Sequence, residues 1–562
     1  GGGRAAGRAP GGACGGMAAS VRSGAAGAGQ CAGVDEELHL AEFLSWCRAL
    51  GADVSTLRLE RDPVRGLGVF TSEAIPAEQT ALRMPAAALL TVPRAARSEV
   101  GRAALGSRAL RGEAISAQAI MYLALIDGLH RPESFWHPWL RLLPRSFTDP
   151  LWWSEDERGR LLAGTQAAHD AARHERQLRD VYGGLFPALS EELPDLFPAA
   201  RYTFDAFRWA RSALASRSFA EDALSTALSP AGADSADSAV VVRVDEPLSA
   251  EERARLRHDC PAFMCPLLDF TNHGVDTTVR VGVLGSGDPA ARDGGSVGLL
   301  VEGGVAAGGE VMNNYGKCRT NLQFLLGYGF CCPDNSADTL PIKLGVPPDV
   351  ASSGIKQGAF ARSGLRLDEV HELSRSTPLP KRLLASLRIL LSSEKALARA
   401  AREAGAGPLK KAARGDAGQA AAATHTAFLD VVCQPLPPAK SASASTELDV
   451  LDAVRQQLLQ KKRALPGVAS NLQSLAERNS AHYRQGQAEV LDAALQAIKR
   501  AEREWCAQHG VSLEEDGAEE AGEEEEGERD GEVDPDADAL GVAPSAGQAL
   551  AGAPPPHKRR RA

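Results

Sequence analysis

The sequence predicts an α+β protein with a β-rich core, an all-α C-terminal domain and disordered ends. Short strand-like runs separated by glycine turns occur before residue 92 and again between residues 262 and 302. Residues 331–510 instead carry apolar residues at the i, i+3, i+4 spacing of helices. A chain of 562 residues is also long for one compact domain, so two folded domains with tails are expected.

Both ends of the chain have the composition of disordered segments. Residues 1–34 are rich in Gly, Ala and Arg, with no acid before Asp35. Organelle transit peptides are also acid-poor and Arg-bearing, which keeps a chloroplast or other organelle open beside the cytoplasm or nucleus. The first residue is glycine, so Met17 is one candidate for the natural start. Residues 511–562 run from acidic to proline-rich and then to the basic cluster Lys558–Arg561, which fits a nuclear signal or a solvated end.

Charge and cysteine content argue against several classes of function. The net charge is −10, yet residues 514–538 hold 15 acids and one arginine, and residues 1–513 hold 57 acids and 57 bases. A neutral folded part offers no bulk basic surface, so no direct nucleic-acid binding is expected. No run of about twenty apolar residues predicts a membrane span. The ten cysteines follow no disulfide or zinc spacing, which predicts a reduced intracellular compartment and no metal.

The first folded segment reads as one helix followed by strands. Gly51 ends the helix. Gly66 precedes the expected strand at Leu67–Phe70 and Gly68 lies within it. Their missing side chains would let a ligand approach the backbone, although a plain hairpin has the same signature. The expected elements are a helix at Asp35–Leu50, strands at Leu57–Leu59, Leu67–Phe70 and Thr80–Met84, and a candidate strand at Ala87–Thr91.

Residues 111–219 are mostly helical in pattern. Ala117–Leu125 has the apolar character of a buried helix, and Phe204–Phe219 predicts another. Four tryptophans lie among prolines between these helices and are interpreted as core rather than as a ligand cage. Residues 221–258 predict a loop-rich excursion around a short strand at Val240–Val242. The tryptophans are Trp136, Trp139, Trp152 and Trp153.

The stretch Pro266–Phe330 is the most informative part of the chain. An apolar run leads to Asn272-His273, and a second segment contains Tyr315-Gly316 and then Tyr328-Gly329-Phe330. Taken singly, these residues predict a turn asparagine, a satisfied buried histidine and a core tyrosine. Strands at Thr277–Leu284 and Gly298–Glu302 and a helix at Asn321–Gly327 surround them; farther on, helices are expected within 382–404, 448–458 and 491–505.

The motifs in this order, taken together, resemble those of a known family, although no single motif is specific enough to do so. R-G-L-G-V-F at Arg65–Phe70 precedes Ser216–Phe219, and D-x-x-N-H, G-E-V, Y-G and Y-G-F follow. This series resembles the SET-domain protein methyltransferases, in particular the branch of the Rubisco large-subunit methyltransferase, over about Asp35–Gln508. The resemblance implies a SET domain at 35–330 with a helical insertion at about 111–258. It also implies a helical substrate-binding domain at 331–510.

The resemblance also implies the site and its chemistry. Tyr315 aligns with the catalytic tyrosine, the cofactor is S-adenosylmethionine, the partner is a protein substrate, and a monomer is expected. A free lysine has a pKa of about 10.4, and burial beside the positive sulfur would lower it, so that no strong general base is needed. The residues that align with the cofactor site are Arg65, Gly66, Leu67, Arg217, Asp269, Asn272, His273, Tyr328, Gly329 and Phe330.

Three alternatives to lysine methylation remain open. Histidine methylation occurs among the relatives, and imidazole is largely neutral near pH 7. A degenerate, non-catalytic binding module would fit the departures from the family pattern, chiefly one extra residue between Tyr315 and Asn321. A metal or thiol enzyme is the least favoured class, because the cysteine spacing does not support it.

Overall fold

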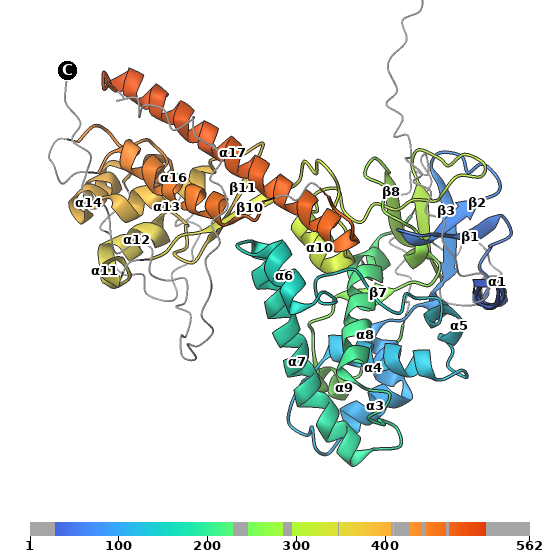
Figure 1. Cartoon of the computed structure of the whole chain (residues 1–562). Helices are drawn as coiled ribbons and strands as arrows, with labels where there is room; N and C mark the ends of the chain where they lie inside the picture. Colours follow the sequence, from blue (N-terminus) through green and yellow to red (C-terminus); the bar gives the residue numbers. More distant parts are fainter. Residues whose placement is uncertain are drawn as a thin grey trace, which may run out of the picture.

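The computed structural model describes residues 29–228, 245–284, 295–346, 348–405, 409, 427–439, 445–467 and 471–512. The expected strand at Val240–Val242 and most of both expected tails lie outside these ranges. Within them, the protein is a mixed α+β structure of small sheets and many helices (Figure 1), which confirms the predicted fold class.

The N-terminal half contains several small sheets. The largest has the antiparallel order β3–β9–β8, and every residue of the central β9 is buried. β1 and β2 form a hairpin, β5 pairs with β7, and β4 runs parallel to β6. The strands are β1 Leu57–Asp62, β2 Gly66–Thr71, β3 Gln79–Pro85, β4 Ile115–Ser116, β5 Ser218–Ala220, β6 Leu256–Arg257, β7 Ala262–Met264, β8 Val279–Leu284 and β9 Ser296–Val301.

The candidate strand at Ala87–Thr91 is not a strand. The alanines form the short 3₁₀ helix η1 (Ala86–Ala88), and only Leu90 makes a β-bridge, to Met264. Alanine is a good helix former and a poor strand former, which explains the difference.

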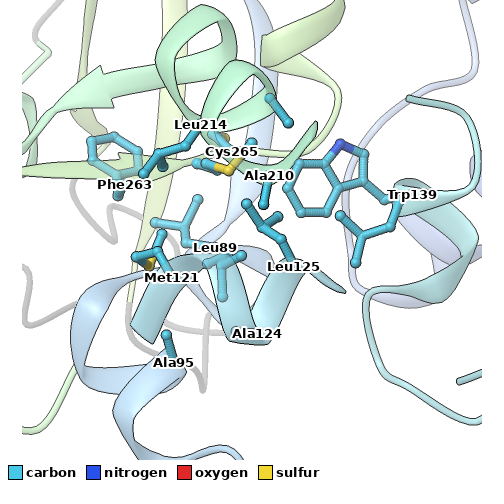
Figure 2. Close-up of a cluster of buried hydrophobic side chains, with 14 of the residues drawn as sticks. Leu89, Ala95, Met121, Ala124, Leu125, Trp139, Ala210, Leu214, Phe263 and Cys265 are labelled. Atoms are coloured by element: carbon cyan, nitrogen blue, oxygen red, sulfur yellow. The ribbon is translucent and has the colours of Figure 1, made fainter. Parts of the chain in front are cut away.

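Helices fill the region between β3 and β7. α4 is apolar on every side and is buried over most of its length, as the absence of a polar face predicts. Its side chains Met121 and Leu125 share one core cluster with Leu214 and Phe263 (Figure 2). The helices are α1 Gly29–Ala49, α2 Val92–Arg97, α3 Glu99–Gly106, α4 Ala117–His130, α5 His137–Leu140, α6 Glu155–Leu162, α7 Gln166–Glu192, α8 Phe204–Arg217, η2 Glu221–Ser225, α9 Ala250–Arg255 and η3 Leu268–Phe270.

The C-terminal part has its own hydrophobic core. It is mainly helical, but the expectation of an all-α domain misses one two-stranded antiparallel sheet. Leu340, Ile342 and Leu373 alternate with more exposed residues, which is the strand period of two. The elements are β10 Thr339–Lys343, α11 Pro348–Ser352, α12 Gly354–Arg362, β11 Val370–Ser374, α13 Lys381–Leu391, α14 Glu394–Glu403, α16 Glu447–Ala464 and α17 Leu475–His509.

α17 is the element that joins the two parts. It runs from the side of α10 (Asn321–Tyr328) to the far end of the helical part (Figure 1). Along its length it contacts α10 and α6 on one side and β10, β11 and α16 on the other. The strand-rich and helical parts are therefore fixed to each other by one continuous helix.

Within the described ranges, no helix is both long and apolar enough to span a membrane.

Candidate functional site

Two segments that are distant in sequence meet where the motifs predict a site. His273 and Asn313 form a parallel β-bridge. The amide of Asn313 donates to the carbonyl of Asn272 at 2.8 Å, and the amide of Gly274 donates to the carbonyl of Asn313 at 2.8 Å. The Asn-His pair and the segment that carries Tyr315 therefore lie side by side.

Tyr315 lies across this junction. Its hydroxyl donates to the backbone carbonyl of Thr271 at 2.8 Å, and its amide donates to Nδ1 of His273 at 3.2 Å. Its ring stacks on that of Tyr328, with the centroids 4.7 Å apart and the planes at 20°. Burial raises the pKa of the Tyr315 hydroxyl above its ordinary value, so the group is a neutral phenol at physiological pH.

Aromatic rings form one wall around Tyr315. Phe324 and Tyr328 are one turn apart on α10, and the ring of Phe324 lies 4.9 Å from that of His273. Gly329 then takes the left-handed conformation, with φ of +77°, and ends the helix. The chain turns back at this glycine, so that Phe330 stacks on Phe324 with the centroids 5.0 Å apart.

Glu310 holds two of the expected cofactor residues together. Its Oε1 accepts a hydrogen bond from Nδ2 of Asn272 at 2.7 Å, and its Oε2 pairs with Nη1 of Arg65 at 2.8 Å. The Glu310 side chain is only 12% exposed, whereas Arg65 is 45% exposed. Glu310 thus fixes the Asn272 side chain, and the ion pair between Glu310 and Arg65 leaves Arg65 at the surface.

The turn at the start of β2 approaches Asn272 with glycine residues, whose backbone carries no side chain. Gly66 has φ of +81°, a conformation that favours glycine. The carbonyl of Leu67 lies 3.4 Å from Nδ2 of Asn272. A Cβ atom at Gly68 would lie 2.6 Å from Oε1 of Glu310, so only glycine fits there without a shift.

Arg217, the last residue of α8, is held by Asp269. Its Nη1 donates to the backbone carbonyl of Asp269 at 2.8 Å and lies 3.7 Å from the carboxylate. The same carboxylate accepts the indole hydrogen of Trp139 at 3.0 Å and is fully buried. Burial raises the pKa of Asp269 to about 7, while Arg217 and the Trp139 bond oppose the rise. The Asp269 carboxylate is therefore enclosed in the interior, and its backbone carbonyl holds Arg217.

The loop after Tyr315 leads to the buried Asn321, the first residue of α10. Gly316 has φ of +141°, and the guanidinium of Arg319 donates back to the carbonyl of Tyr315. Asn321 is buried, and its side chain donates to Asp338 at 2.9 Å and accepts from the amide of Cys332 at 2.8 Å. These two hydrogen bonds fix Asn321 at the start of α10.

A cavity of about 320 Å³ lies beside this site, among α4, α7, α8 and the approach to β7. Nη2 of Arg211 donates to Nδ1 of His174 at 3.1 Å, and Nη1 donates to the carbonyl of Leu326 on α10 at 3.2 Å. Burial, with a smaller contribution from Arg211, lowers the pKa of His174 to about 4, so this imidazole is neutral. The lining includes Gln118, Tyr122, His174, Gln177, Arg211, Ser218 and Cys260.

Sequence reasoning missed three residues that shape the site. Glu310 belongs to the G-E-V block, but its bond to Asn272 was not expected. Trp139 lies in the core, as predicted, and its indole also donates a hydrogen bond to Asp269. Phe324 lies at helical spacing before Tyr328, and that spacing was the available signal.

No family model matches the chain. Curated relatives include the actin-histidine N-methyltransferases of Mus musculus, 25% identical, and of Gallus gallus, 26% identical. Each match extends over 367 residues, which is 64% of this chain and 54% of the relative. The chain therefore spans about half the length of the curated relatives it matches.

The matches to solved structures cover more of this chain than the matches to curated sequences do. The SET domain of LSMT bound to lysine and AdoHcy superposes with a TM-score of 0.60 at 18% identity, covering 84% of this chain and 92% of that one. Rubisco LSMT bound to sinefungin and monomethyllysine gives a TM-score of 0.59 at 18% identity, covering 83% and 93%. The chain thus has the fold of the SET-domain methyltransferase structures of the Rubisco LSMT branch, as the order of its motifs predicted.

Proposed function

We propose that this chain is a protein methyltransferase that uses S-adenosylmethionine and transfers its methyl group to the ε-amine of a lysine in another protein. The observation that carries the proposal is the position of Tyr315, whose hydroxyl binds the backbone beside the Asn272-His273 pair. The methyltransferase activity of the similar proteins, and the lysine and AdoHcy in a similar structure, support it.

The residues present fit such a cofactor. Nε of Arg217 is a buried polar atom without a hydrogen-bond partner among the described residues. The guanidinium suits a carboxylate at the amino-acid end of the cofactor. The turn backbone at Gly66, where a Cβ atom would have nothing within 4 Å, offers an open surface, and the aromatic rings of Tyr328 and Phe330 offer an apolar wall. S-adenosylmethionine supplies an already electrophilic methyl group on a sulfonium.

The chain itself positions the nitrogen and excludes water. The Tyr315 hydrogen is donated to Thr271, so the phenol oxygen keeps lone pairs that can accept an N–H from an incoming amine. The phenol is neutral, because burial raises its pKa, and it acts by orientation and not as an anionic base. Burial of the amine favours its neutral form, which is the nucleophile.

A lysine acceptor is favoured over histidine by the polar groups around Tyr315. A bound imidazole has a second ring nitrogen that needs a partner when it is buried. The nearby Asn272 side chain is already bonded to Glu310, and the Asn314 side chain donates to backbone carbonyls at 3.1–3.4 Å. An amine on a flexible apolar stem needs no such partner.

Histidine is the second candidate, and one observation favours it. The curated relatives are actin-histidine N-methyltransferases. Acid hydrolysis of the methylated product followed by amino-acid analysis separates methyl-lysine from methyl-histidine directly.

The cavity beside α7 and α8 is our candidate for binding the acceptor protein. Ser218, which lines the cavity, directly follows Arg217 in the sequence. Arg211, which also lines it, donates a hydrogen bond to the carbonyl of Leu326 on α10. Gln177 lines it from an exposed position on α7. Gln177→Trp, which fills part of the cavity, is expected to raise the KM for the acceptor protein about tenfold, with cofactor affinity unchanged.

The test of the proposed function is transfer of labelled methyl from S-adenosylmethionine to protein in a cell extract. Tyr315→Phe is expected to lose most activity and keep cofactor binding. Tyr202→Phe is the matched control, because its buried hydroxyl has no partner among the described residues. Full activity of Tyr315→Phe would overturn its assigned role. Absence of cofactor binding by calorimetry would leave the chain as a non-catalytic binding module.

A further inference from the structure

The first turns of α17 contact the segment that ends the aromatic wall. Nδ2 of Asn479 donates to the carbonyl of Gly329 at 2.9 Å, and its Oδ1 accepts from the amide of Cys331 at 3.2 Å. Asn479 is 7% exposed, so both bonds are made away from solvent. A single side chain of the C-terminal part therefore fixes the backbone on both sides of Phe330.

The other end of α10 is tied to the same helix. The Asp338 carboxylate accepts from the backbone amide of Asn321 at 2.6 Å and from its side chain at 2.9 Å. On α17, Gly486 faces this carboxylate, and a Cβ atom there would lie 2.1 Å from Oδ2 of Asp338. Close packing against α17 thus holds the start of α10 as Asn479 holds its end.

Apolar packing joins these two polar contacts. Tyr483, which is fully buried on α17, belongs to one core cluster with Leu325 of α10 and Cys331. α10 carries Phe324 and Tyr328 against the site. The position of the rings that flank Tyr315 is therefore set by three consecutive contacts with α17.

We propose that Asn479 is a positioning residue of the methyl-transfer site, which it reaches through Gly329. The inference rests on the proposed function and extends it: the C-terminal helical part completes the active site in addition to any role in binding the acceptor. Asn479 touches no reacting atom. It holds the backbone from which Tyr328 stacks on Tyr315.

Coupling of this kind is reciprocal. A ligand that orders the Tyr328–Phe330 wall must also stabilise the first turns of α17. In the full-length protein, S-adenosylhomocysteine is expected to slow amide hydrogen exchange in residues 479–486 about threefold or more, and to leave α13 unchanged. Unchanged exchange on α17 with saturating ligand would overturn the inference.

Asn479→Ala tests the residue itself. It is expected to lower kcat about tenfold, to leave the KM for the acceptor protein within about twofold, and to remove the ligand-dependent protection of α17. Gln485→Ala, an exposed amide on the same helix, is the control and is expected to match the parent chain in all three. Parental kcat in a folded Asn479→Ala protein would overturn the proposal.

The design separates this inference from the function on which it rests. If the parent chain fails to bind S-adenosylhomocysteine by calorimetry, the proposed function fails. If the parent chain binds it but α17 shows no protection, the positioning role alone fails. The exchange experiment on the parent chain needs no variant, so the inference stays refutable even if Asn479→Ala does not fold.

Discussion

Asp269→Asn should change how the stability of the protein depends on pH. The Asp269 carboxyl is fully buried, and its pKa is raised from 3.8 to about 7. In the unfolded chain this group loses its proton near pH 4, but in the folded chain it keeps the proton until about pH 7. Between these values the folded state binds more protons, so its stability falls as pH rises.

The size of this effect follows from the shift. About three pKa units at about 1.4 kcal/mol per unit give about 4 kcal/mol over the full window, and about 3 kcal/mol of that lies between pH 5 and pH 8. The charged or ionisable groups that face Asp269 are Arg217 from α8, Cys47 from α1, Cys265 directly after β7, and Tyr315. Both buried thiols have pKa values raised above their ordinary range, so they stay neutral across this window.

Urea unfolding of both proteins at pH 5, 6, 7 and 8 measures this difference. The free energy of unfolding of the parent chain, minus that of Asp269→Asn, should fall by about 3 kcal/mol from pH 5 to pH 8. Asp205→Asn, at an exposed site, is the control and should show a constant difference. A constant difference for Asp269→Asn as well would show that Asp269 is already ionised at pH 5, with Arg217 outweighing the effect of burial.

Three further substitutions test other contacts. Glu310→Ala removes the partner of both Asn272 and Arg65 and should weaken S-adenosylhomocysteine binding about tenfold by calorimetry, whereas unchanged affinity would count against the cofactor site. Gly329→Ala places a Cβ atom 2.4 Å from a threonine hydroxyl at positive φ and should cost about 2 kcal/mol or more of stability, while Gly327→Ala, where nothing lies within 4 Å, should be neutral or stabilising. Glu447→Ala leaves a buried arginine unpaired and should cost about 3–5 kcal/mol in urea unfolding, and a loss below about 1 kcal/mol would contradict the importance of that pair.

The fold could be predicted from the sequence because its signals are local. Strand runs, glycine turns and helical spacing each lie within a few residues, and the motif order supplies the topology that they lack. β10 and β11 escape this reasoning because the sequence around them has mainly helical spacing, against which two five-residue strands with an alternating pattern are a weak signal. The first half of α17 escapes it for another reason. Asn479 and Gln487 are buried and hydrogen-bonded there, so a search for apolar periodicity finds only residues 491–505.

The candidate site, too, could be predicted from local sequence patterns only in part. Tyr315 and the Asn272-His273 pair lie in recognisable motifs, and the structure brings them together. The role of Glu310 depends on Arg65, which is 245 residues away, and is set by the bridge between Phe70 and Glu310. No local pattern contains such a pairing, because it exists only after the strands are in register.

The partner of the Tyr315 hydroxyl is a main-chain oxygen, that of residue 271. Every amino acid supplies that oxygen, so evolution can exchange the residue at this position without removing the acceptor. A comparison of side chains alone would count such an exchange as a lost contact. The hydroxyl's anchor is therefore inherited with the path of the chain, and it can persist among relatives whose sequences have diverged beyond easy alignment.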